Sequence, residues 1–127
     1  MNTRAVRRTI AERITDVVPG VQVHTHPPGA LPHTPAVVIV RQSYDIFEPF
    51  GAAAPNTRWN LVALCDATDV SKGDDLDDLV DNIVDALSDP DALSVGSVKV
   101  VDVGDEDRID VGGAWYYAAT LRCEVIT

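Results

Sequence analysis

Cysteine, aromatic residues and long apolar runs are all scarce in this chain of 127 residues. Its two cysteines, Cys65 and Cys123, each lie in an apolar stretch, which favours buried free thiols, with a disulfide or redox pair as the alternative. The longest apolar run extends only from Pro35 to Val40, whereas a membrane helix needs roughly 20 apolar residues. The N-terminal residues show no apolar segment followed by a small-residue cleavage site. We therefore expect no membrane segment and no secretory signal, and a protein that stays in the cytosol.

Positive charge is scarce as well, because ten Lys and Arg stand against twenty Asp and Glu, for a net charge of −10. A chain this acidic repels phosphate, which argues against sequence-specific binding to duplex DNA and against binding to anionic lipid. A hydrophobic share of 46% and a charged share of 24% are typical of a globular protein. The length predicts one domain over residues 1–127.

Two kinds of apolar pattern alternate along the chain. Apolar residues recur every three or four positions in two segments, which predicts amphipathic helices at 3–18 and 71–89. Alternating or β-branched runs predict strands at 21–25, 36–44, 58–66, 95–103 and 109–126. Gly112-Gly113 is expected to turn or bulge the chain ahead of the last strand. The predicted fold is α+β: a mixed, mainly antiparallel sheet of about five strands, with two helices packed on one face.

A long segment at residues 45–57, rich in alanine, proline and glycine, separates two of the predicted strands. Loops of this length inside a compact domain tend to be functional or mobile. Phe47 and Phe50 lie near its tip, where an exposed aromatic ring is costly without a partner or a packing role. The sequence therefore predicts a long hairpin arm whose phenylalanines contact a partner.

The basic residues gather on the first predicted helix. Its arginines are Arg4, Arg7, Arg8 and Arg13. Such a cluster is either a solvated helix face or a contact with an acidic protein. Because the whole chain is negative, that acidic neighbour could be a second copy of the chain itself.

Ten acidic residues and a single lysine lie between positions 66 and 91. Several fall in the first turns of the second predicted helix, where the helix dipole favours negative charge, and Ser71 with Asp74 has the spacing of a capping box. A calcium-binding loop does not fit, because the position that requires glycine carries Asp74. The acids are thus either solvated or face a neighbouring subunit or a channel. Those assigned to such an interface are Asp74, Asp75, Asp78 and Asp81.

Three histidines, His24, His26 and His33, raise the question of a metal site. No further ligand accompanies them at a fixed spacing, so we expect solvated or interface histidines that make assembly sensitive to pH between about 5 and 7. The acids from Asp102 to Asp110 indicate an open loop, and no nucleophile motif or phosphate-binding glycine loop is present in the sequence. We predict no catalytic, cofactor-binding or metal site, with a small-ligand or metal-binding module as the alternative from another class.

Several features follow one another in a characteristic order. They are an N-terminal helix, the Pro-Ala-Val-Val-Ile-Val strand from Pro35, the long arm, the strand Arg58-Trp59-Asn60-Leu61-Val62, the helix from Leu76 to Leu87 and the closing strand with Tyr116-Tyr117. In this combination, over nearly the whole chain, the sequence resembles the tail terminator (tail-completion) proteins of long-tailed bacteriophages. The resemblance implies a small structural subunit without a catalytic site, which forms a hexameric ring on the finished tail tube, stops its growth and offers a surface to the head connector.

The same resemblance implies the partners. They are other copies of the chain in a hexameric ring, the tail tube protein, the head-tail connector proteins, and DNA that passes through the lumen without specific binding. The expected location is the tail-neck junction of the virion, after assembly in the host cytoplasm. Another neck or head-tail connector subunit is the alternative within the structural class.

Overall fold

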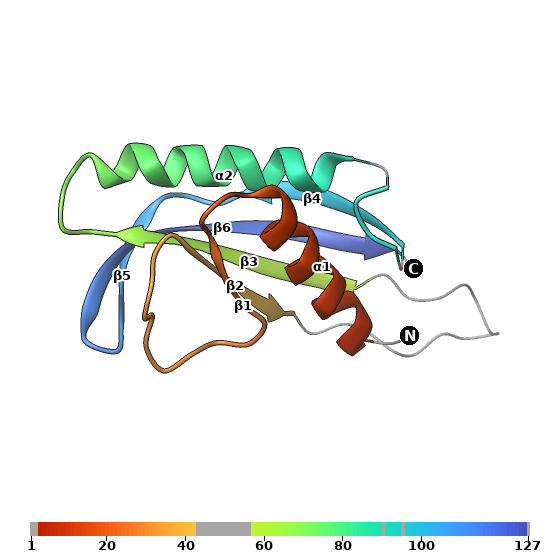
Figure 1. Cartoon of the computed structure of the whole chain (residues 1–127), viewed down its shortest axis with the longest axis horizontal. Coiled ribbons are helices and arrows are strands. Elements are labelled where there is room, and N and C mark those ends of the chain that lie inside the picture. The colour runs from red at the N-terminus through yellow and green to blue at the C-terminus, as the bar shows by residue number, and fades with distance from the viewer. Residues whose placement is uncertain (1–2, 43–56, 90, 95, 127) are drawn as a thin grey trace.

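The computed structural model describes residues 3–42, 57–89, 91–94 and 96–126 (Figure 1). Apart from Thr57, which begins a strand, the predicted arm at 45–57 lies outside these residues, and with it Phe47 and Phe50. Within the described residues, neither helix is both long enough and apolar enough to cross a membrane.

Two helices and six strands make up the described chain. The helices are α1 (Thr3–Val17) and α2 (Lys72–Ser88). The strands are β1 (Gln22–His24), β2 (Ala36–Arg41), β3 (Thr57–Asp66), β4 (Ser97–Val103), β5 (Asp107–Val111) and β6 (Ala114–Ile126). Every predicted helix and strand region is confirmed, with shifts of a few residues at its ends.

The strands form one sheet in the order β1-β2-β3-β6-β4, and β5 also pairs with β6. The β1–β2 pair is parallel and the other pairs are antiparallel. The central pair runs from Thr57 opposite Val125 to Asp66 opposite Tyr116. The prediction of an α+β fold with a mixed, mainly antiparallel sheet is therefore confirmed.

The sheet has one strand more than predicted, because the segment 109–126 turns back on itself. Gly112 and Gly113 have φ values of 62° and 89°, so two consecutive residues adopt the left-handed conformation that a tight hairpin turn requires. β5 thereby pairs with the first half of β6, while β4 pairs with its second half. β4 and β5 form one interrupted edge, broken at residues 104–106, where the Gly104 amide donates to the Thr120 carbonyl oxygen at 2.8 Å.

Both helices pack on the same face of the sheet, as predicted (Figure 1). In α1, Val6, Ile10 and Ile14 form the buried stripe. The larger buried side chains of α2 are Leu76, Leu79, Ile83 and Leu87. They meet the odd-numbered residues of the two central strands, Trp59, Leu61, Ala63, Cys65, Ala119, Leu121, Cys123 and Val125. This single layer is the main core.

The opposite face of the sheet carries a smaller apolar cluster and a polar region. The residues after β1 bring Leu31 onto the sheet, where it packs with Ala36, Val38, Leu64, Tyr116 and Ala118. Farther along the same face, Gln42 donates to Asn60 at 2.9 Å and Arg122 donates to Asp102 at 2.7 Å. The polar half of this face explains why β2, β3 and β6 mix apolar and charged residues.

The start of α2 differs from the predicted capping box. Ser71 has helical backbone angles and its side chain makes no capping hydrogen bond. The Asp69 side chain instead accepts a hydrogen bond from the Ser71 amide at 3.0 Å, and the Lys72 amide donates to the Asp69 carbonyl oxygen at 3.0 Å. Ser71 is therefore the N-cap residue, as predicted, but the capping-box hydrogen bond is absent, and Asp69 instead closes a turn just before the helix.

The β5–β6 turn gives a stability prediction with its own control. A Cβ atom on Gly112 would lie 2.7 Å from the carbonyl oxygen of Gly29, whereas a Cβ on Gly113 meets nothing within 4 Å among the described residues. Both glycines have positive φ, so both alanine variants suffer backbone strain of about 1 kcal/mol. We expect Gly112→Ala to lower the free energy of unfolding by more than Gly113→Ala in urea denaturation. Equal losses would show that the loop at Gly29 does not constrain the turn.

Candidate assembly surfaces

Of the four arginines predicted on the first helix, Arg7 contacts the body of its own chain. Its Nη1 donates to the carbonyl oxygens of Thr25 and, at 2.9 Å, Ile39, and its guanidinium lies 5.1 Å from the ring centre of Trp59. Burial, and secondarily the charge of Arg41, lower the pKa of Arg7 from its ordinary value. Arg7 therefore attaches α1 to the sheet.

Arg13 also contacts its own chain. Its Nε donates to the Ala86 carbonyl oxygen at 2.8 Å, and its Nη2 lies 3.6 Å from a carboxylate oxygen of Asp89. Ala86 is in the last turn of α2, where unpaired carbonyl groups concentrate negative partial charge. Arg13 thus joins α1 to the C-terminal end of α2.

Arg4 and Arg8 differ from these two. Both side chains are exposed, and neither has an ion-pair partner among the residues that the structure describes. They are four residues apart on α1, so they lie on one helix face. Of the four arginines assigned to an interface, these two are available for contact with another molecule.

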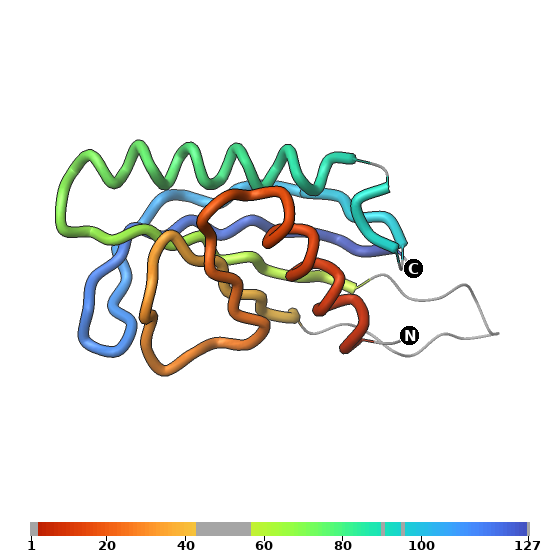
Figure 2. Tube along the Cα trace, in the orientation of Figure 1, coloured from red at the N-terminus to blue at the C-terminus, as the bar shows by residue number. Residues whose placement is uncertain are grey.

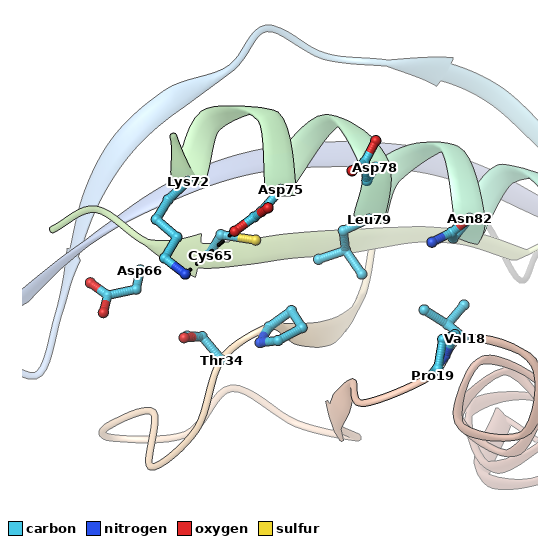
Figure 3. A pocket seen from close by; sticks show the side chains of 11 residues that line it. Val18, Pro19, Thr34, Cys65, Asp66, Lys72, Asp75, Asp78, Leu79 and Asn82 are labelled. Carbon is cyan, nitrogen blue, oxygen red and sulfur yellow. Dashed lines mark ion pairs between the residues drawn. The ribbon is translucent and has the colours of Figure 1, made fainter. Parts of the chain in front are cut away.

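The acidic residues of α2 divide between two sides of the helix. Asp75 and Asp78 line a cavity of about 190 Å³ between α2 and the loops around Pro19 and Pro35 (Figure 3). In this cavity Lys72 lies 3.4 Å from Asp75. Asp74 is exposed, and Asp81 lies on the side of α2 that faces β4. The predicted acidic set is therefore at the surface, but it does not form one patch.

A second hollow lies between α2 and the break in the β4–β5 edge. Its volume is about 530 Å³. We call it the acidic groove, and its residues are Leu76, Asp77, Val80, Asp81, Val103, Gly104, Asp105, Glu106 and Ala119. The four acids among them are exposed, while Leu76 and Ala119 are buried. A Cβ atom on Gly73 would be 3.5 Å from Oε1 of Glu106, so the loop at 104–106 lies against the start of α2.

Three of the groove acids, Asp77, Asp105 and Glu106, were not among the predicted interface residues. The spacing of Asp77 and Asp81 on a helix could have grouped these two. Nothing in the sequence indicated that the acidic loop at 104–106 lies beside α2, because that neighbourhood results from the β4–β6 pairing.

The acidic groove and the exposed arginines lie over opposite edges of the sheet, because α1 packs beside β1 and the groove lies beside the end of β4. Figure 2 shows α1 starting near the end marked N, while α2 starts at the far side, next to the β5–β6 hairpin. Arg4 and Arg8 are in the first turns of α1, and Asp77 is in the first turns of α2. The two surfaces cannot meet within one chain.

The β5–β6 hairpin carries an aromatic side chain that sequence reasoning did not single out as a contact residue. Trp115 is 53% exposed, and the Arg108 guanidinium lies 5.2 Å from its ring centre. Exposed Trp and Arg residues are enriched among side chains that dominate binding at protein interfaces. The presence of a Trp was the one indication in the sequence, but the apolar alternation there predicted only that Trp115 lies in a strand.

The three histidines do not form a cluster. His24 is on β1, whereas His26 and His33 are exposed in the loop that follows. The His24 Nε2 is buried without a hydrogen-bond partner among the described residues, and the same holds for Oε1 of Gln22. Within the described residues, no group of three or more His, Cys, Asp or Glu side chains is arranged to hold a metal ion.

Both cysteines are buried and free, as predicted. Burial raises the pKa of Cys123 from 9.0 to about 12. For Cys65, burial and then the charge of Asp75 raise the pKa to about 11, against an opposing effect of Lys72. Both thiols are therefore protonated at neutral pH.

No family model matches this chain, and no curated protein matches it significantly.

The contacts of Arg13 predict a loss of stability that Arg8 does not share. Arg13→Met keeps the aliphatic stem but removes the hydrogen bond to Ala86 and the charge beside Asp89. We expect a loss of about 1–2 kcal/mol in the free energy of unfolding, measured by urea denaturation. The matched variant Arg8→Met should stay within about 0.5 kcal/mol of the wild type. Equal losses in the two variants would contradict a bridging role for Arg13.

The raised thiol pKa values predict a loss of stability at high pH. Below pH 9 the thiols are protonated in both states, whereas between about pH 9 and 11 the unfolded chain loses protons that the folded chain keeps. The free energy of unfolding should then fall with rising pH by about 1.4 kcal/mol per pH unit for each thiol. The free energy of unfolding is measured by denaturation at several pH values for the wild type and for a variant with Cys65→Ala and Cys123→Ala. Above pH 9 it should fall less steeply with pH in the variant. Parallel slopes would rule out a contribution from the thiols.

Proposed function

We propose that this protein is a structural subunit of a long-tailed bacteriophage, a tail terminator. Copies of the chain form a hexameric ring at the end of the finished tail tube, at the tail-neck junction of the virion. The ring stops polymerisation of the tube protein and offers an attachment surface to the head-tail connector proteins.

The observation that carries this proposal is the pair of oppositely charged surfaces on opposite sides of one subunit. Exposed Arg4 and Arg8 lie on α1, which packs beside β1, and the acidic groove lies at the other edge of the sheet, beside the end of β4. Complementary surfaces on different parts of a subunit give heterologous, head-to-tail contacts, which close into a ring when the rotation between neighbours is right. A tail terminator needs head-to-tail contacts of this kind, because they close its subunits into a ring, and a closed ring adds one defined layer to the tube.

Two further observations support the proposal. The order of elements agrees with the resemblance of the sequence to tail terminator proteins: a helix precedes β2, a long segment precedes β3, and α2 precedes the closing hairpin. The net charge of −10 suits a ring around a DNA passage, since a negative wall repels the phosphate backbone and lets it slide.

Capping of tail tubes tests the function directly. A tail tube protein of a long-tailed bacteriophage is polymerised with and without this chain, and electron microscopy measures tube length and looks for density at tube ends. We expect shorter tubes with a ring at one end. Light scattering of the isolated ring should give a mass of about six times that of the 13.7 kDa subunit. Tubes of unchanged length with bare ends would overturn the proposal.

A further inference from the structure

We propose that the acidic groove receives the first two turns of α1 from a second copy of this chain. The inference rests on the proposed function, because it specifies which surfaces of neighbouring subunits meet in the ring. It assigns Arg4 and Arg8 of one subunit to Asp77 and Asp81 of the next.

The spacing of the charges is matched on the two helices. Arg4 and Arg8 are four residues apart on α1, and Asp77 and Asp81 are four residues apart on α2. Side chains at this spacing project from one helix face about one turn apart. Each arginine of one subunit can therefore face one aspartate of the next.

The groove suits arginine better than a small cation. Val80 and Val103 line it beside the acids, and Val103 is 44% exposed. An arginine stem covers apolar surface of this kind while its guanidinium stays with the carboxylates at the rim. Asp105 and Glu106 on the loop opposite α2 would hold the guanidinium groups from the other side.

The partner is a second copy because the chain carries both complementary surfaces and neither is neutralised within one subunit. Among the described residues, the ion pairs involve none of the groove acids and neither exposed arginine. The two surfaces lie over opposite edges of the sheet. A subunit therefore offers its arginines to one neighbour and its groove to another.

The contact is confined to the N-terminal turns of α1. Farther along the same helix, the exposed charges are Glu12 and Asp16. These carboxylates would repel the groove acids if the neighbouring helix lay along the groove over its full length. Only the first two turns of α1 can therefore lie along the groove, with Glu12 and Asp16 beyond its end.

Charge reversal on each surface separately tests the inference. The groove variant carries Asp77→Lys and Asp81→Lys, and the helix variant carries Arg4→Glu and Arg8→Glu. Sedimentation equilibrium in about 50 mM salt, where charges are weakly screened, measures self-association. We expect each variant to associate at least about 10-fold more weakly than the wild type, because two attractions become repulsions.

Mixing the two variants supplies the decisive comparison. In an equimolar mixture, the lysines of the groove variant meet the glutamates of the helix variant, and the unchanged groove meets the unchanged arginines. Association should recover toward the wild-type level. A variant with Asp85→Lys and Asp91→Lys makes the same change in net charge at exposed residues outside the groove, and should associate like the wild type or more strongly.

The outcomes separate this inference from the proposed function. The inference is wrong if the mixture fails to recover, if the control variant loses association as the groove variant does, or if the wild type stays monomeric at millimolar concentration in low salt. A groove variant that self-associates normally but no longer binds tube ends would assign the groove to the tube protein and also overturn the inference. In each case, tube capping by the wild type still decides the function.

Discussion

The pairing of β3 with β6 is the constraint on which the rest of the structure depends. Its register, from Thr57 opposite Val125 to Asp66 opposite Tyr116, sends the odd-numbered residues of both strands toward the helices. A slip of one residue would move Trp59 and Leu121 from the main core to the polar face. Because α1, α2 and the β4–β5 edge are all placed against these two strands, the positions of the surface charges also follow from this register.

The arginines of α1 show how one helix combines two roles. Arg7 and Arg13 lie at the borders of the buried stripe, so their side chains reach the carbonyl oxygens of Ile39 and Ala86. Arg4 and Arg8 lie farther from the stripe and remain exposed. Two members of the basic cluster thus attach α1 to its own chain, and the other two remain at the surface.

Apolar periodicity was sufficient to predict the α+β class, both helices and their common face, because burial of each stripe leaves few arrangements. It did not separate β5 from β6, since the alternation of apolar residues continues across Gly112 and Gly113 and the turn depends on their positive φ angles. Apolar periodicity also could not predict that Arg7 and Arg13 attach α1 to the rest of the chain. Their acceptors, Ile39 and Ala86, are far away in sequence and come close only after the helices have packed on the sheet.

The sequence predicted the charges of the candidate assembly surfaces but not how distant segments combine to form them. Charge runs indicated a basic first helix and an acidic second one, and exposed Arg4, Arg8 and Asp81 agree with that division. The acidic groove itself needs two segments, α2 and the loop at 104–106, which sequence patterns treat as separate clusters. Only the pairing of β4 with β6 brings them together.

The interrupted edge of the sheet has a consequence for how copies of this protein can coexist at high density. The β4 register shifts between Val100 and Asp102, the edge then breaks at residues 104–106, and β1 at the other edge has only 3 residues. Neither edge offers the long, regular ladder of amide and carbonyl groups on which a further strand could grow. Both edges therefore disfavour the strand-to-strand pairing between copies through which proteins grow into fibres.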